Sequence, residues 1–200
     1  MSDRSCNCST RLGGCHATII ELCACVSWFG TVESLGSRTP DLQIPKNLQA
    51  PSDQQLLFKL AAQGSQIYEC KATNNPTQFE WVLKAPDAVL LDDRGQRSGK
   101  HYGGPTWEAN DGSKIAGHLQ EKTPAPDQND IPWLLLQVKS HQGTGKFSPV
   151  NWIQRVQTQG GKAPDKGCDR AHEKAEVRVS YTANYHFYGA SPLQNSLSEY

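Results

Sequence analysis

The segment EVRVSYTANYHFY (176–188) constrains the fold more than any other part of the chain. Its residues alternate between two faces. Val177, Val179, Tyr181, Ala183, Tyr185 and Phe187 lie on one face, and Glu176, Arg178, Ser180, Thr182, Asn184 and His186 lie on the other. A period of two is that of a β-strand with one buried side. A strand this long needs a large sheet to cover its apolar face.

The rest of the chain follows the same pattern of short strands and turns. QLLFKLAA (55–62) is an apolar run that we expect to end at Gly64, and SQIYECKA (65–72), QFEWVLKA (78–85), AVLLD (88–92), IPWLLLQVK (131–139) and VNWIQRVQT (150–158) are further strands. TWEA (106–109) and KIAGHL (114–119) flank Asp111-Gly112, a strong hairpin signal. We predict an all-β fold, an antiparallel β-sandwich or barrel of about 8–10 strands. At most one short helix is expected, near Asp169–Ala175.

Charge and hydrophobicity exclude two classes of partner. The 20 basic and 20 acidic side chains balance, so no net field favours nucleic acid. The sequence contains no apolar run long enough for a transmembrane segment. We therefore predict that the protein binds no nucleic acid and has no membrane span.

Residues 1–40 differ from the body in their cysteine content. Five of the seven cysteines fall in this region, with C-x-C spacings that are a weak signal for a metal site. Other interpretations are a degenerate secretory signal, interrupted by Glu21, or a leader or disordered tail, which we favour. The expected organisation is a Cys-rich leader (1–40), one all-β domain (41–188) and a frayed tail (189–200).

Several runs resemble, in order and spacing, the domain of unknown function 3455 family, found in bacteria and fungi. These runs are GSQIYEC, WVLKAP, HYGGPTWEANDGS, IPWLLLQV, IQRVQTQGGKAP and YTANYHFY, and the likeness covers roughly residues 41–188. The resemblance implies a secretory leader, and hence a secreted, periplasmic or cell-surface location. No activity is established for that family, so the resemblance implies no catalytic residues.

Some fungal relatives carry a malate dehydrogenase label, which the sequence can test. A dinucleotide site requires a glycine-rich turn between a parallel strand and a helix. The nearest candidate, GTGKFS (143–148), is followed by Pro149 and a strand-like run. We therefore reject an NAD-dependent dehydrogenase and expect no cofactor.

Cys70 and Cys168 are the two cysteines of the predicted domain. In an exported protein they would form a disulfide, which is the interpretation we favour. The alternative is two unconnected thiols. The sequence contains no C-x-x-C motif, which would indicate a redox centre.

The stretch HYGGPTWEANDGSK (101–114) is the candidate site. Tyr102 and Trp107 flank Gly103-Gly104-Pro105, a turn that would present aromatic rings to a small molecule or glycan, with His101, Glu108 and Asp111 as polar contacts. The 121–130 loop would extend this surface. We favour a binding or structural module without a metal. If the stretch has only a structural role, Trp107 would instead pack in the core.

The alternative is a metal-dependent or hydrolytic enzyme centred on His101, Glu108 and Asp111, with His118 nearby. The sequence contains no G-x-S-x-G elbow, and no H-x-H or H-x-x-x-H spacing occurs in this stretch. Convergence of the three side chains would favour the enzyme, and an exposed Trp107 beside a groove would favour binding.

Overall fold

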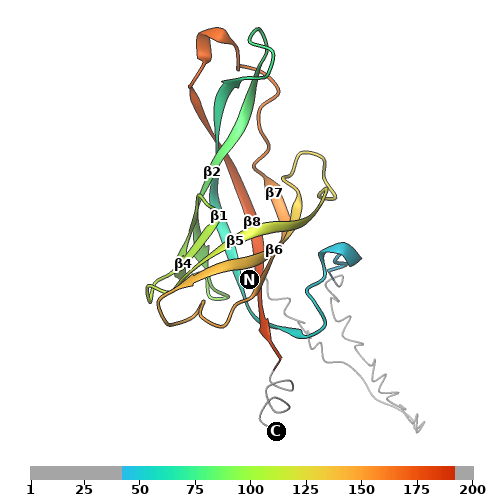
Figure 1. Cartoon of the computed structure of the whole chain (residues 1–200), viewed down its shortest axis with the longest axis vertical. Coiled ribbons are helices and arrows are strands. Elements are labelled where there is room, and N and C mark those ends of the chain that lie inside the picture. The colour runs from blue at the N-terminus through green and yellow to red at the C-terminus, as the bar shows by residue number, and fades with distance from the viewer. Residues whose placement is uncertain (1–41, 192–200) are drawn as a thin grey trace, which may run out of the picture. The chain divides into compact units, whose positions relative to one another are not determined.

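The structure, a computed structural model, describes residues 42–191, and these form a closed barrel of eight antiparallel strands in chain order (Figure 1). The strands are β1 (Gln54–Ala72), β2 (Phe79–Leu91), β3 (Arg97–Tyr102), β4 (Thr106–Ala109), β5 (Lys114–Thr123), β6 (Trp133–Gln142), β7 (Trp152–Gly160) and β8 (Glu176–Ala190). Two 3-10 turns, η1 (Lys46–Leu48) and η2 (Arg170–His172), are the helical elements of the described residues. The predicted all-β class is confirmed, and the barrel resolves the choice between sandwich and barrel.

Strand β8 closes the barrel by pairing with both β1 and β7. Its predicted alternation is confirmed, since Tyr181, Ala183, Tyr185 and Phe187 are all buried in the core. The strand continues to Ala190, two residues past the predicted end of the domain. The remainder of the predicted tail and the leader 1–40, with its metal and signal hypotheses, lie outside the described residues.

The expected strand break at Gly64 is wrong. Strand β1 runs through Gly64 without interruption and pairs there with Ala88 of β2. A Cβ on Gly64 would lie 2.2 Å from the carbonyl oxygen of Asp87, so this glycine permits close approach of two strands. The two predicted runs 78–85 and 88–92 likewise form one strand, β2, which contains Pro86.

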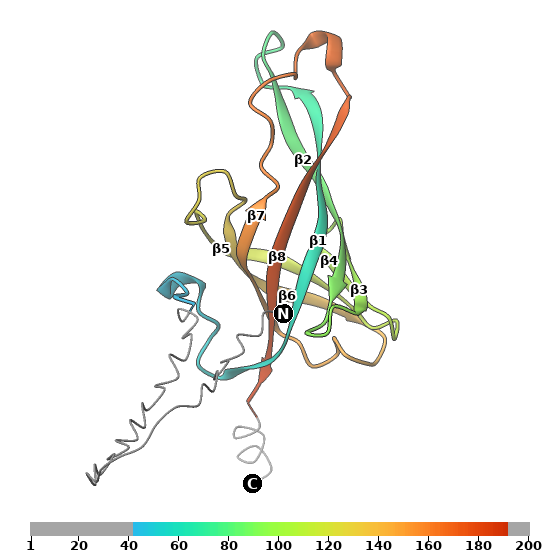
Figure 2. The ribbon, with the colours of Figure 1, turned by 180° about the vertical axis from the view of Figure 1, so that it is seen from behind.

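Strand β3 was not predicted from the sequence. Its residues RSGKHY lack an apolar alternation because Gly99 occupies an inward position, where a Cβ would lie 2.3 Å from the carbonyl oxygen of Glu108. Pairing with β2 and β4 defines the strand instead, and Figure 2 shows β3 and β4 side by side. The predicted hairpin around Asp111-Gly112 joins β4 to β5, with Gly112 at a φ of 84°.

The apolar core has two parts. The barrel interior holds the larger cluster, which includes Leu60, Leu90, Trp107, Ile153 and Phe187. A second cluster contains Leu48, Trp133, Leu135 and Val156, with Leu42 and Ile44 packed against it. Because Leu135 alternates with the inward Leu134 and Leu136, this second cluster covers the outside of β6 and β7 with residues from the segment before β1.

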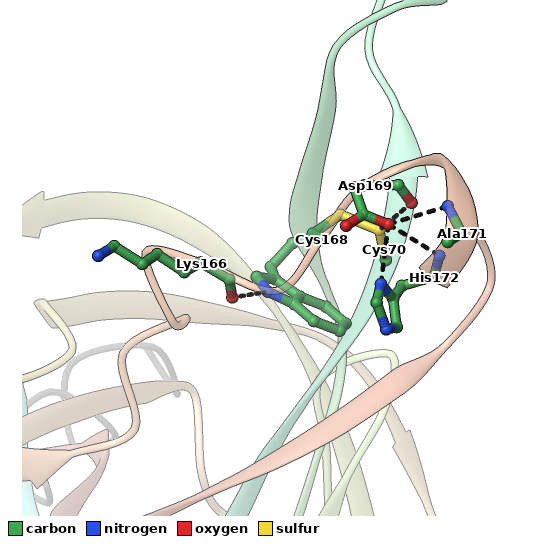
Figure 3. Close-up of polar contacts among 7 residues, drawn as sticks. Cys70, Lys166, Cys168, Asp169, Ala171 and His172 are labelled. Atoms are coloured by element: carbon green, nitrogen blue, oxygen red, sulfur yellow. Dashed lines mark hydrogen bonds and ion pairs between the residues drawn. A yellow bond between two sulfur atoms is a disulfide. The ribbon is translucent and has the colours of Figure 1, made fainter.

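Strands β1, β2 and β8 continue past the others as a three-stranded extension, made of residues 65–72, 79–86 and 176–180 (Figures 1 and 2). The Cys70–Cys168 disulfide joins the end of β1 to the loop before β8. Figure 3 shows this bond beside the η2 turn, where the carboxylate of Asp169 accepts hydrogen bonds from the backbone N–H groups of Ala171 and His172. The expected pairing of the two cysteines is present in the structure.

Removal of this disulfide is expected to destabilise the domain. The bond closes a loop with a sequence separation of 98 residues, for which chain entropy predicts a contribution of about 4–5 kcal/mol. Denaturant unfolding of the full chain and of the Cys70→Ser/Cys168→Ser double variant measures the loss. The single variant Cys168→Ser is the matched control and should lose as much; equal stability of wild type and double variant would contradict the prediction.

Candidate functional site

A cavity of about 270 Å³ lies inside the barrel, at the base of the three-stranded extension. All eight strands contribute to its wall. Its apolar lining includes Pro86 (β2), Trp107 (β4), Leu119 (β5) and Leu136 (β6). Its polar lining includes Gln66 (β1), His101 (β3), Arg155 (β7) and Tyr185 (β8). A closed barrel of eight strands is the size at which the interior is either filled by side chains or holds one small ligand.

His101 reaches this interior because it alternates with Lys100 and Tyr102 along β3 and pairs across the sheet with Trp107. Its Nδ1 lies 2.9 Å from the carbonyl oxygen of Thr106, which can only accept, so Nδ1 carries the proton. Burial lowers the pKa of His101 to about 3, against the effect of the Thr106 hydrogen bond. The imidazole is therefore neutral near pH 7, and Nε2 offers a lone pair as a hydrogen-bond acceptor.

Trp107 is one of two fully enclosed aromatic residues of the cavity wall, with 1% of its surface exposed, as for Tyr185. The His101 ring stacks on its indole at a centroid distance of 4.4 Å, and the Tyr185 ring approaches it edge-on at 5.5 Å. Trp81 and Trp152, which lie within predicted strands, are both only half-buried. Trp81 lies in the extension, where its Nε1 donates to the carbonyl oxygen of Lys166.

Several buried polar atoms in and beside this wall have no hydrogen-bond partner within residues 42–191. They are both amide atoms of Gln66, Nε1 of Trp107 and the hydroxyl oxygens of Tyr181 and Tyr185. Leaving a buried polar group unpaired costs about 1–3 kcal/mol, and native proteins seldom leave several together. Their concentration around one cavity indicates that its occupant supplies hydrogen bonds.

Arg155 brings a positive charge to the same wall. It pairs across the sheet with Leu134 on one side and Tyr185 on the other, which places it on the inward face of β7. Its Nε and Nη2 donate to the carbonyl oxygen of Pro132 at 3.2 and 2.8 Å. Among residues 42–191, no carboxylate lies within the 4.0 Å of an ion pair with this guanidinium.

Tyr102 and Glu108 lie on the outer face of the same hairpin. The Tyr102 hydroxyl donates to Glu108 Oε2 at 2.7 Å, and the ammonium groups of Lys100 and Lys114 each lie 3.2 Å from the Glu108 carboxylate. The Tyr102 hydrogen bond, followed by the two lysines, lowers the pKa of Glu108 to about 2. This carboxylate is ionised and paired, so it does not resemble a catalytic acid.

Asp111 holds the β4–β5 turn against the β6–β7 loop. Its Oδ1 accepts from the backbone N–H and hydroxyl of Ser113 at 2.9 and 2.6 Å, and its Oδ2 accepts from the backbone N–H of Lys146 at 2.7 Å. These hydrogen bonds lower the pKa of Asp111, that from the Ser113 hydroxyl most of all. Each interaction is structural.

The five predicted site residues are thus divided by the barrel wall. His101 and Trp107 line the cavity, whereas Tyr102, Glu108 and Asp111 do not. His101, Glu108 and Asp111 do not converge, and no group of three His, Cys, Asp or Glu side chains within residues 42–191 is arranged to hold a metal ion. The 121–130 loop does not line the cavity either.

Gln66, Arg155 and Tyr185 are cavity residues that sequence reasoning missed as functional. Tyr185 was assigned to the core face of β8, where it belongs. Arg155 lies two residues after the buried Ile153 on β7 and therefore on the same inward face. A charged residue at a core position was the sequence signal that could have marked it as functional. Gln66 has the same parity as Tyr68 and Cys70 along the predicted strand 65–72, so a polar residue on the apolar face was the available signal there too.

The buried neutral His101 makes stability depend on pH. An imidazole has a pKa of 6.5 when unperturbed and about 3 in this fold, so between these values the unfolded chain binds one more proton. The free energy of unfolding should therefore decrease as the pH falls below 6.5, by about 1.4 kcal/mol per pH unit from this residue. His101→Gln should show a correspondingly shallower decrease in urea unfolding experiments between about pH 4 and 6.5. Parallel curves for the two proteins would contradict a buried neutral imidazole.

No helix of the described residues 42–191 is long and apolar enough to cross a membrane.

The comparisons with known proteins identify the family and leave its activity open. Searches of curated proteins and of solved structures found no match to the chain. The family model described as "Protein of unknown function (DUF3455)" matches residues 51–189, which include all eight strands of the barrel except the last residue of β8. The chain therefore belongs to the DUF3455 family of proteins of unknown function.

Proposed function

We propose that this domain is a binding module that holds one small, largely apolar molecule inside its barrel. The observation that carries the proposal is the interior cavity, whose apolar wall contains buried polar atoms without partners at Gln66, Trp107 and Tyr185. Apolar walls with a few convergent polar groups are typical of small-molecule sites. A bound molecule would pair the polar atoms and fill the space between them.

The size of the cavity limits what it can hold. Its volume of about 270 Å³ lies just below the range of about 300–1,000 Å³ typical of sites for drug-sized ligands. A single small organic molecule fits this space better than an oligosaccharide. One face of Trp107 is also covered by His101, which leaves little of the ring for stacking against a sugar.

The rim of the cavity supports entry of an apolar molecule. Leu83 and Leu119 line the cavity and remain 51% and 49% exposed, and they are two of the three large hydrophobic side chains exposed in the described residues. Gly104 and Pro105, from the turn between β3 and β4, also line it. Exposed apolar side chains at the edge of a concave site commonly mark where a ligand enters.

The cavity supports binding better than catalysis. A general base works best with a pKa near the operating pH, and the pKa of His101 is lowered to about 3. Glu108 and Asp111, which the enzyme hypothesis requires, contribute nothing to the cavity lining. In this proposal His101 acts as a neutral acceptor that orients the bound molecule.

Binding of benzamide, a neutral aromatic probe, tests the proposal. Benzamide should saturably shift the NMR signal of the Trp107 indole N–H, assigned with Trp107→Phe. Leu134→Trp adds a large side chain to the cavity wall and should abolish the shift. The matched control Gln137→Trp adds the same side chain to the opposite face of β6 and should retain it. A shift that persists unchanged in Leu134→Trp would overturn the proposal.

We also propose that the domain is exported, to the cell surface, the periplasm or the medium. The support is the Cys70–Cys168 disulfide, because such bonds persist in oxidising compartments and are rare in the cytosol. Mass spectrometry of native material after alkylation without reduction should find neither cysteine alkylated. Complete alkylation of both cysteines would remove the basis for this location.

A further inference from the structure

The charged groups at the cavity indicate which chemical class it accepts. The lining residues include two cations, Lys84 and Arg155, and no Asp or Glu. Lys84 is neutralised by an ion pair with Glu176 of β8. Arg155 has no carboxylate within ion-pair distance among residues 42–191. The cavity wall therefore carries one uncompensated positive charge.

The guanidinium of Arg155 retains donors for a ligand. Two of its nitrogens, Nε and Nη2, bond to one acceptor, the carbonyl oxygen of Pro132. A guanidinium has five N–H donors, so Nη1 and the second proton of Nη2 remain. The bond to Pro132 fixes the orientation of the planar group, which lowers the entropy lost when a ligand binds.

Hydroxyl donors lie beside this cation. Tyr185 is the cross-strand neighbour of Arg155, and its hydroxyl lies near the Tyr181 hydroxyl and the Arg155 guanidinium. It makes no hydrogen bond of normal geometry among residues 42–191. Burial raises the pKa of Tyr185, an effect that the nearby positive charge of Arg155 partly opposes, so the hydroxyl stays protonated and able to donate. Tyr181, four residues earlier on the same face of β8, has a second hydroxyl without a hydrogen bond of normal geometry among residues 42–191.

We propose that the molecule held in the barrel is a small organic carboxylate, whose anionic group binds Arg155 and the Tyr185 hydroxyl while its apolar body packs against Leu119, Leu134 and Leu136. This inference rests on the proposed binding function and names its ligand class. Arg155 is half-buried, so water would solvate its exposed part before a ligand binds. A neutral apolar ligand would displace that water without replacing the lost solvation, whereas a carboxylate replaces it with a charge-assisted pair.

Benzoate and benzamide test this inference because they share a shape and differ in charge. In titrations of the full-length protein, benzoate should bind at least about tenfold more tightly than benzamide, as expected for a hydrogen bond to a charged group. Arg155→Gln should reduce benzoate affinity to that of benzamide and leave benzamide affinity unchanged. Arg155→Lys keeps the charge without the planar fork and should retain part of the preference.

A measurement on the wild type keeps the inference testable if Arg155→Gln does not fold. The side-chain NMR signals of Arg155, assigned with Arg155→Lys, should shift with benzoate and not with benzamide. Equal affinities for the two probes in the wild type, or an equal loss of both in folded Arg155→Gln, would overturn the carboxylate inference and leave cavity binding intact. Failure of both probes to bind the wild type would overturn the binding function itself.

Discussion

The pairing of β1 with β8 is the interaction on which the rest of this structure depends. It joins the first and last strands along almost their whole length, from Gln54–Ala190 to Glu69–Glu176. Closure removes the exposed edges that an open sheet would present. It also directs the inward side chains of all strands into one enclosed volume, so each polar group there must find its partner inside the barrel.

This constraint explains why the interior combines so many aromatic rings with a cavity. His101, Trp107, Tyr185 and Phe187 contact one another in a chain of ring pairs. Rings pack in a few preferred geometries and do not deform to fill residual space. At the base of the extension, where β3 and β4 no longer accompany β2, the wall is made by the 83–86 segment and the Gly104-Pro105 turn, and the space remains open.

The sequence predicted the elements whose pattern is local. The alternation of apolar and polar residues was sufficient to predict β8, and the Asp111-Gly112 pair was sufficient to predict the β4–β5 hairpin. Strand β3 and the continuity of β1 through Gly64 were missed because glycines at those positions permit close contact with the neighbouring paired strand, at Glu108 for Gly99 and at Asp87 for Gly64. The five residues predicted as one site are divided for a related reason: neighbours along a strand lie on opposite faces, so His101 and Tyr102 do not share a surface. Its inward members needed partners from β1, β7 and β8, which no local motif specifies.

The position of the disulfide determines how the closed barrel can come apart. Cys168 precedes β8 and is bonded to Cys70, next to the last β1–β8 pair, Glu69–Glu176. The backbone groups of Cys70 also bond to Ala175 and Lys174 on the same stretch. The paired strands β1 and β8 therefore cannot separate from this end while the disulfide is intact. Strand separation is therefore expected to start at the opposite end, at Gln54 and Ala190, and to expose the Phe58–Phe187 ring pair before it reaches the cavity.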